Sequence, residues 1–249
     1  MTGHPHGTAA PGAVIEEIAA LGPFFAVSTH PAGAPPAGPW ASMTGPLLAE
    51  RAAGVRAYLA AAGGQPQDAV EPRVAASVAH LGLAARLVSP ALAAAVLHRR
   101  PLGYDLGAVR WQPALGGPVP VSLPDDALRP ALPAPDRLAD AVARLLLDGP
   151  LAELADHMGA LGVSRHILLG NTASAVNGAA TALAAARPEL AARAHAFTAL
   201  LLDRPPLRAQ SARTPAGTFR RRSCCLIYRA APDRAGALCG DCVLHGTPA

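Results

Sequence analysis

The chain has 249 residues, enough to bury a sizeable core, and about half of them are apolar, with few aromatics. All 21 basic residues are arginine, and the net charge of +4 is too small and too dispersed to indicate nucleic-acid binding. No run of 18 apolar residues occurs, so we expect no integral membrane segment. The first residues lack a basic and then apolar leader, which leads us to expect a cytoplasmic protein.

Capping and breaking residues divide the chain into short helices. Residues 1–12 are His-, Gly- and Pro-rich, and we expect them to be disordered. Thr44 precedes one helix as its cap and Ser164 another, while Asp136 is expected to cap a third. Pro90 is expected to break the longest apolar pattern into two pieces. The expected helices are 13–21, 45–62, 72–89, 91–98, 136–147, 150–161, 165–186 and 188–202.

The middle of the chain changes to a strand pattern. Apolar residues alternate in 109–112 and again at Val119 and Val121, with Gly116, Gly117 and Pro118 between them, which predicts a β-hairpin. We therefore expect a mainly α protein: a helical body over 13–215 with a small β-hairpin, and a C-terminal cysteine-ligated metal segment over 216–249. Residues 203–217 are expected to be a linker between the two. The last segment has too few apolar residues for a core of its own, so it must fold onto the body.

All four cysteines of the chain lie in this last segment. They follow the pattern Cys-Cys-x13-Cys-x2-Cys: Cys224, Cys225, Cys239 and Cys242. Thiols that merely fill a core would be scattered along the chain, and disulfides are rare in the cytosol. Four thiols gathered in nineteen residues therefore indicate one shared ligand.

Two kinds of metal centre suit four thiolates. A structural zinc site normally takes two Cys-x2-4-Cys knuckles, and only Cys239 and Cys242 have that spacing. The side chains of the adjacent Cys224 and Cys225 diverge in most backbone conformations, which a [2Fe-2S] cluster tolerates better because it shares its ligands between two irons. The spacing favours the cluster over zinc and leaves zinc open.

The residues around the cysteines resemble a known family. Residues 221–229 read Arg-Arg-Ser-Cys-Cys-Leu-Ile-Tyr-Arg and residues 239–244 read Cys-Gly-Asp-Cys-Val-Leu, which is similar to the C-terminal signature of the FhuF-like siderophore-iron reductases. Softer likenesses to that family are the stretches 76–86 and 170–175, the latter reading Gly-Asn-Thr-Ala-Ser-Ala. The loop between the cysteine pairs, residues 226–238, is three residues longer than the family's usual ten, and we expect the surplus to bulge outward.

The resemblance implies a [2Fe-2S] cluster held by the four cysteines. It further implies a ferric siderophore reductase, which reduces siderophore-bound Fe(III) by one electron and so releases Fe(II), with hydroxamate siderophores favoured. Arg222, Tyr228, Asp241 and Asn171 fall on family-like positions, and we expect them to tune the cluster or face the substrate. Arg220, Arg221, Arg222 and Arg229 would raise the potential of the cluster and could guide a reductant or an anionic complex. For Arg220 and Arg221 a solvated face is an interpretation of at least equal weight.

No phosphate-binding loop, dinucleotide fingerprint or catalytic triad occurs in the sequence. Electrons are therefore expected from a separate partner such as a ferredoxin or a flavoprotein. The alternative is a non-catalytic iron-sulfur or zinc-binding module that binds a siderophore or a protein partner without turnover.

Overall fold

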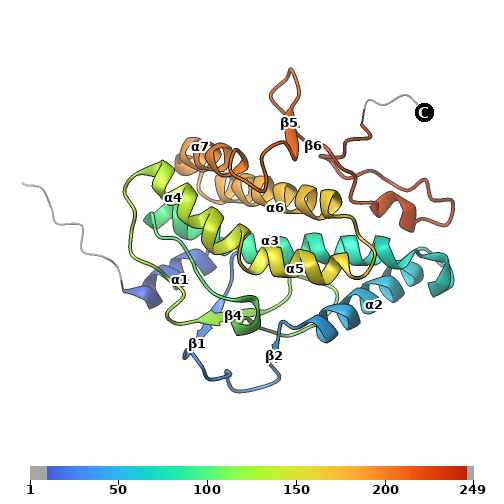
Figure 1. The fold of residues 1–249 in the computed structure, drawn as a ribbon, viewed down its shortest axis with the longest axis horizontal. Coiled ribbons are helices and arrows are strands. Elements are labelled where there is room, and N and C mark those ends of the chain that lie inside the picture. The colour runs from blue at the N-terminus through green and yellow to red at the C-terminus, as the bar shows by residue number, and fades with distance from the viewer. Residues whose placement is uncertain (1–9, 246–249) are drawn as a thin grey trace, which may run out of the picture.

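The computed structural model describes residues 10–245 and is mainly helical, as the sequence predicts (Figure 1). Residues 1–9 of the predicted disordered terminus lie outside the described range, whereas Pro11 and Gly12 already belong to the first helix. The helices are α1 (Pro11–Ala19), α2 (Gly45–Ala62), α3 (Pro72–His98), α4 (Pro135–Val142), α5 (Pro150–Gly159), α6 (Arg165–Ala186) and α7 (Ala191–Leu202). The strands are β1 (Ser28–His30), β2 (Ala41–Ser42), β3 (Arg110–Trp111), β4 (Val121–Pro124), β5 (Ser211–Arg213) and β6 (Phe219–Arg221).

The body is organised around α3, which packs most extensively against α6 and α2. The predicted break at Pro90 is wrong, because α3 continues through this residue to His98. Pro90 has no N–H to offer the carbonyl of Arg86, and the Ser89 hydroxyl donates to the carbonyl of Ala85 at 2.7 Å in the same turn. The residues on both sides of Pro90 are buried, so the packing of the whole helix outweighs the one lost hydrogen bond.

By length and composition α3 passes as a membrane span, and it is the one helix among residues 10–245 that does. Its most apolar window is, however, 78% buried inside the protein, as expected for a central core helix.

Arg86 shows how the same helix also holds the β region. Its buried guanidinium donates to the carbonyls of Val119, at 2.7 Å, and Ala26, at 2.6 Å.

The predicted hairpin is present and belongs to a larger sheet. β3 and β4 pair antiparallel, with Trp111 opposite Val121, and β1 and β2 extend them into the order β1-β4-β3-β2. β1 runs parallel to β4, which sequence patterns could not indicate because the partners are about ninety residues apart. Trp111 is fully buried, so the sheet closes the core on the side away from the cysteine segment (Figure 1).

Several predicted boundaries shift. α1 begins at Pro11 and not at residue 13. α4 begins at Pro135, so Asp136 lies in its first turn, where it pairs with Arg204 at 2.9 Å and does not cap the helix. The helix then changes to a π turn over Ala143–Leu147. Ser164 does cap α6, accepting from the backbone N–H of Ile167 at 3.4 Å.

The predicted linker 203–217 is only partly irregular. It contains β5, which pairs antiparallel with β6 and forms a second, two-stranded sheet. β6 leads directly into the first cysteine pair, so the C-terminal segment starts from a regular hairpin. In Figure 1 this hairpin rises beside α6, and the rest of the segment turns back over the start of α3.

Candidate metal centre

Hydrogen bonds from β6, one from its backbone and one from a side chain, hold the Cys239–Cys242 turn beside the strand that leads to Cys224 and Cys225. The N–H of Arg221 donates to the carbonyl of Asp241 at 3.0 Å, and the guanidinium of Arg220 donates to the carbonyl of Cys242 at 2.8 Å. A tight turn, in which the Cys242 N–H donates to the Cys239 carbonyl at 3.0 Å, then orients the second pair. Thirteen residues of intervening loop therefore do not separate the thiols in space.

The four sulfurs form two crossed pairs. Cys225 Sγ lies 3.6 Å from Cys239 Sγ, and Cys242 Sγ lies 3.6 Å from Cys224 Sγ, and all four cysteines are free. A metal–thiolate bond of about 2.3 Å places two thiolates on one tetrahedral ion roughly 3.8 Å apart, so each pair has the spacing of two ligands on one ion. The adjacent Cys224 and Cys225 belong to different pairs, which removes the difficulty that adjacency poses for a single ion.

Within residues 10–245 no group of three or more His, Cys, Asp or Glu side chains is compact enough for one metal ion. The two sulfur pairs, Cys225–Cys239 and Cys224–Cys242, are linked because Cys224 and Cys225 are adjacent in the chain. Two linked pairs suit a centre with two metal ions better than a zinc site with one, in agreement with the sequence spacing. Cys225 and Cys242 are each 1% exposed, whereas Cys224 and Cys239 are partly exposed. One ligand of each pair therefore reaches towards the surface, which matters for electron exchange.

Arg221 is the residue whose position the sequence left open. Of the two interpretations, a solvated face is excluded, because its side chain is fully buried beside the sulfurs. Its guanidinium donates to Cys239 Sγ at 2.6 Å and to Asn171 Oδ1 at 2.8 Å, and its Nε lies 3.3 Å from Asp241 Oδ1. The sequence contains one indication of this burial. Residues two apart in a strand lie on the same face, and Phe219 and Arg221 share the buried face of β6.

The buried cation favours thiolates. Burial alone would lower the pKa of Arg221, but the neighbouring Cys225, Asp241 and Cys239 hold it above its ordinary value. A hydrogen bond with the Cys224 thiol, and then the bond and charge of Arg221, lower the pKa of Cys225 to about 5. The same hydrogen bond raises the pKa of Cys224, and burial raises the pKa of Cys239 although the charge of Arg221 lowers it. The buried guanidinium therefore favours the thiolate form of Cys225, which is the form that binds iron.

Side chains of α3 and α6 attach the segment to the body. Asn171 on α6 donates to the carbonyl and hydroxyl of Ser77 on α3, at 3.0 and 3.1 Å, and the Ser77 hydroxyl donates to the carbonyl of Cys225 at 2.8 Å. Ser174, one turn further along α6, donates to Asp241 Oδ2 at 2.5 Å. Asn171 and Asp241, both predicted site residues, therefore meet the cysteines through one polar network.

The other two predicted residues lie outside this network. Arg222 is exposed and its Nε donates to the carbonyl of Ser211 at 3.4 Å. Tyr228 is half-buried in the 3₁₀ turn Ile227–Ala230, where its carbonyl accepts from Gly236 at 2.9 Å. Among the hydrogen bonds of the described residues, none joins either side chain to a cysteine, and their proposed roles stay predictions.

The cysteine segment approaches α6 closely at Gly170. A Cβ added there would lie 2.0 Å from the hydroxyl of Ser223 and 3.3 Å from its Cβ. Ser223 is buried, and its hydroxyl has no hydrogen-bond partner among the described residues. Gly170 therefore provides the space in which the residue before the first cysteine rests.

Replacing Gly170 by Ala should lift the segment from α6 and destabilise the protein by about 1–3 kcal/mol, because the added methyl group overpacks a buried contact. The variant should also hold less iron per chain. The double variant Gly170→Ala with Ser223→Ala should recover most of both properties, since the clashing oxygen is removed. Denaturant unfolding and iron analysis of the two variants and of Ser223→Ala alone would test this. An unrescued double variant would contradict the close approach.

The long loop 226–238 is anchored at its start and exposed beyond. Ala230 packs with Ala60, Val70 and Val74 at the junction of α2 and α3. The Gln65 side chain donates to the carbonyl of Ala230 at 2.6 Å, and in the same loop the guanidinium of Arg229 pairs with Glu71. Residues 232–235 are exposed, which agrees with the expected outward bulge.

Deleting residues 233–235 should therefore leave the visible spectrum and reduction potential of the metal centre nearly unchanged. The deletion shortens the loop from thirteen residues to ten, and loop closure predicts a change of only a few tenths of a kcal/mol. Anaerobic redox titration beside the unaltered protein measures this directly. A large shift in potential, or rapid loss of colour in air, would mean that the loop tip shields the sulfurs.

Comparison with known proteins agrees with this geometry. The fold and site define a helical protein with a four-thiol C-terminal segment. Residues 221–244 match the family model described as the FhuF 2Fe-2S C-terminal domain, so this C-terminal segment is FhuF-like and its cofactor is a [2Fe-2S] cluster. A search of curated proteins found no match to the chain. The four cysteines would hold the cluster, and Arg221 would donate to one of its sulfur ligands.

Proposed function

We propose that this protein is a ferric siderophore reductase. The observation that carries the proposal is the partial exposure of Cys224 and Cys239, one from each sulfur pair, within an FhuF-type domain. When bound, the [2Fe-2S] cluster supplies one electron at a time. The electron converts siderophore-bound Fe(III) into Fe(II), which oxygen donors hold more weakly, and the siderophore leaves chemically unchanged.

An apolar groove beside the site supports this proposal. It has a volume of about 280 Å³ and lies between α3 and α6, with Leu81, Ala85, Ser174 and Gly178 among its lining residues. Ser174 also holds Asp241, the residue between the last two cysteines. Ser174, Asp241 and Arg221 therefore link the groove to the Cys239 sulfur, and the groove can seat the apolar linkers of a hydroxamate siderophore.

The groove can be filled without disturbing the fold. Gly178 is exposed on α6, and a Cβ added there meets nothing within 4 Å. Gly178→Leu should slow electron transfer to a bulky ferric hydroxamate at least several-fold while leaving transfer to ferricyanide unchanged. Gly82→Leu is the matched control, because Gly82 is also an exposed helical glycine with open space and does not line the groove. Equal rates for all three proteins would argue against the groove as the substrate seat.

The central test mixes dithionite-reduced protein anaerobically with a ferric hydroxamate siderophore and a ferrous chelator. The cluster should reoxidise as the Fe(II) chelate appears, with one electron per iron released. The Cys239→Ser variant should give neither signal. If the reduced protein persists with hydroxamate, catecholate and carboxylate siderophores alike, the reductase reading fails, and a binding module without turnover is the better description.

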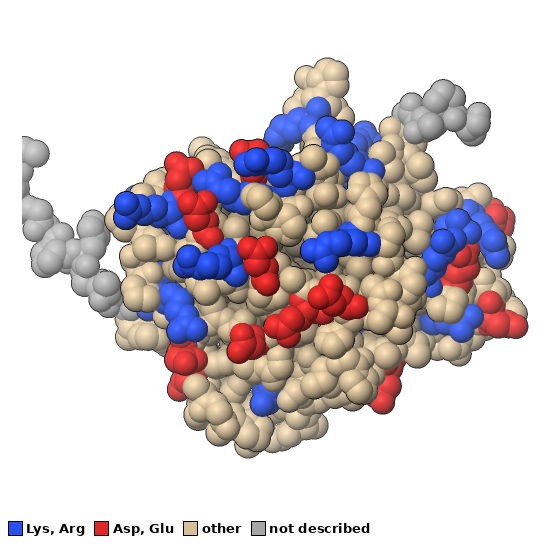
Figure 2. All heavy atoms as spheres, in the orientation of Figure 1, with Lys and Arg blue, Asp and Glu red and all other residues tan. Residues whose placement is uncertain are grey.

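The electron donor is proposed to be a separate ferredoxin or flavoprotein in the cytoplasm. Basic side chains gather at the base of the β5–β6 hairpin (Figure 2). Arg213 and Arg222 are exposed on this hairpin and just after it, and Arg220 is half-buried. Such a basic rim attracts acidic redox proteins over long range, and its effect on the rate should weaken as salt is added.

A further inference from the structure

A second pocket lies at the other end of α3, far from the cysteines. Ala95 and Val96 contribute to its wall near the end of that helix, whereas Ser77 contacts the cysteine segment near the start. Eighteen residues of helix separate Ser77 from Ala95, which corresponds to about 27 Å. This pocket is therefore no part of the proposed reductase site.

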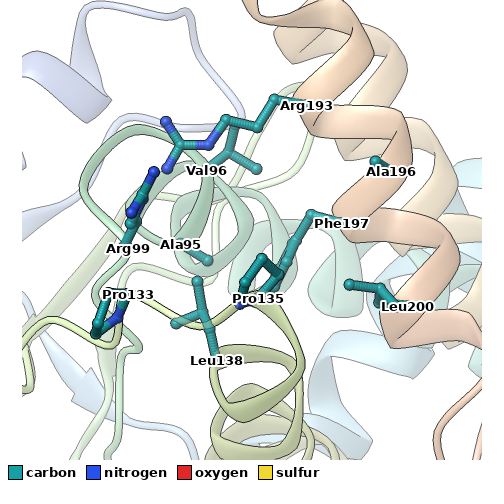
Figure 3. Close-up of a pocket in the computed structure, with 10 residues that line it drawn as sticks. All are labelled: Ala95, Val96, Arg99, Pro133, Pro135, Leu138, Arg193, Ala196, Phe197 and Leu200. Atoms are coloured by element: carbon teal, nitrogen blue, oxygen red, sulfur yellow. The ribbon is translucent and has the colours of Figure 1, made fainter.

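The pocket has an apolar floor with two arginines at one end (Figure 3). Its volume is about 250 Å³, and its apolar wall comes from three helices, including Leu138 of α4 and Phe197 and Leu200 of α7. Pro133 and Pro135 complete the wall and restrict its backbone. Ala95, Val96, Leu138 and Phe197 are packed in the core, so the floor of the pocket is preformed and does not need an ordering step.

The two arginines lack the partners that arginines usually have. Within residues 10–245 no carboxylate lies within ion-pair distance of Arg99 or Arg193. The nearby acids are already engaged: Asp136 and Asp140 on α4 pair with Arg204 at 2.9 and 2.7 Å. Partial burial, and then the positive charge of Arg99, lower the pKa of Arg193, so the two cations repel each other.

The backbone conformation of Arg99 also indicates that an arginine has a role at this position. Arg99 ends α3 with φ of 56°, in the left-handed region that glycine or asparagine normally occupies at this helix position. An arginine here carries a conformational cost that glycine would avoid. In Figure 3 its guanidinium points towards that of Arg193 at the pocket end.

We propose that this pocket binds a small amphiphilic anion, with the head group between Arg99 and Arg193 and the apolar part on the floor formed by α3, α4 and α7. A carboxylate or a phosphate head provides the negative charge that the two arginines lack, and both bind guanidinium groups through paired hydrogen bonds. The volume is slightly below that of drug-sized ligand pockets, which limits the apolar part to a short chain or a single ring.

Isothermal titration of the full holoprotein with octanoate and with octyl phosphate tests the proposal. At least one should bind saturably with one site per chain, and the tighter of the two identifies the head group. Octanol, which has no charge, and acetate or inorganic phosphate, which have no tail, should each bind at least tenfold more weakly. Arg193→Gln should weaken the amphiphile at least tenfold, and Arg99→Gln with Arg193→Gln should remove measurable binding.

Arg137→Gln provides the matched control, because Arg137 is an exposed arginine of α4 that does not line the pocket. Its affinity should equal that of the unaltered protein. The visible spectrum of each variant verifies that the cysteine site is intact. Absence of saturable binding by both amphiphiles, or an affinity that the double arginine variant leaves unchanged, would overturn the proposal.

Discussion

Serine at any one of Cys224, Cys225, Cys239 or Cys242 should abolish the [2Fe-2S] cluster or leave it strongly destabilised. Each thiol is half of a 3.6 Å pair, and the chain has no fifth cysteine to replace a lost one. An alcohol is a much weaker ligand than a thiolate at neutral pH, so a serine leaves one iron incompletely held. Iron and acid-labile sulfide should both fall to a small fraction of the unaltered protein's content.

Loss of the cluster should change the structure only in the C-terminal segment. The C-terminal segment has little core of its own, and its geometry depends on the metal centre and on the contacts of Ser77, Asn171 and Ser174. Residues 216–245 should become sensitive to protease in the cysteine variants, while the helical body keeps its far-ultraviolet spectrum. Metal analysis and limited proteolysis measure the two effects separately.

His245 offers the control for this experiment. It is the nearest alternative donor in the sequence, and its ring bonds to the carbonyl of Cys239 at 2.9 Å. The His245→Ala variant should keep its full cluster. A cysteine variant with unaltered iron, sulfide and spectrum would show that its residue is no ligand, and a His245 variant without cluster would place the histidine in the ligand set.

The features that sequence reasoning predicted well are those encoded locally. The cysteine cluster stands within nineteen residues, and Thr44 and Ser164 occupy the predicted positions before their helices, so each signal can be read from a short stretch. Only the Ser164 side chain accepts a capping hydrogen bond; that of Thr44 makes none. Asn171 and Asp241 were found through family likeness, because nothing in their immediate neighbours shows that they face the same buried arginine. The hairpin of β3 and β4 was found from its turn and alternation.

The features that sequence reasoning missed depend on partners distant in the chain. Pro90 stays helical because the surrounding helices bury α3 on both sides of it, and local propensity contains no record of that packing. β1 pairs with a strand some ninety residues away. The position of Arg221 was left open between a solvated face and a role in tuning the cluster, because arginine is rarely buried. Only the sulfurs, Asn171 and Asp241 together make its burial favourable.

The reduction potential of the cluster should fall when Arg221 is replaced by Gln. Its buried guanidinium donates to Cys239 Sγ, and the reduced cluster carries one more negative charge than the oxidised one, so Arg221 stabilises the reduced form more. A hydrogen bond to a charged group contributes about 1.5–3 kcal/mol, so ~65–130 mV is the upper bound of the one-electron decrease, and only the part of that energy that differs between the oxidised and reduced cluster shifts the potential. Arg221→Lys keeps the charge without the forked geometry and should lower the potential by less.

Loss of Arg221 should also destabilise the segment, because Asp241 then loses its buried cation and keeps only Ser174. If Arg221→Gln holds too little cluster to titrate, the Lys variant and Asn171→Ala supply the comparison. Asn171→Ala removes the group that orients the guanidinium and should give a smaller decrease. Arg222→Gln is the matched control, since Arg222 is an exposed arginine one residue away, and its potential should be unchanged. Anaerobic redox titration of the four variants measures these differences. The prediction fails if Arg221→Lys has the potential of the unaltered protein and Arg221→Gln has a potential no lower than that of Arg222→Gln. In that case the buried guanidinium holds the segment in place without setting the potential of the cluster.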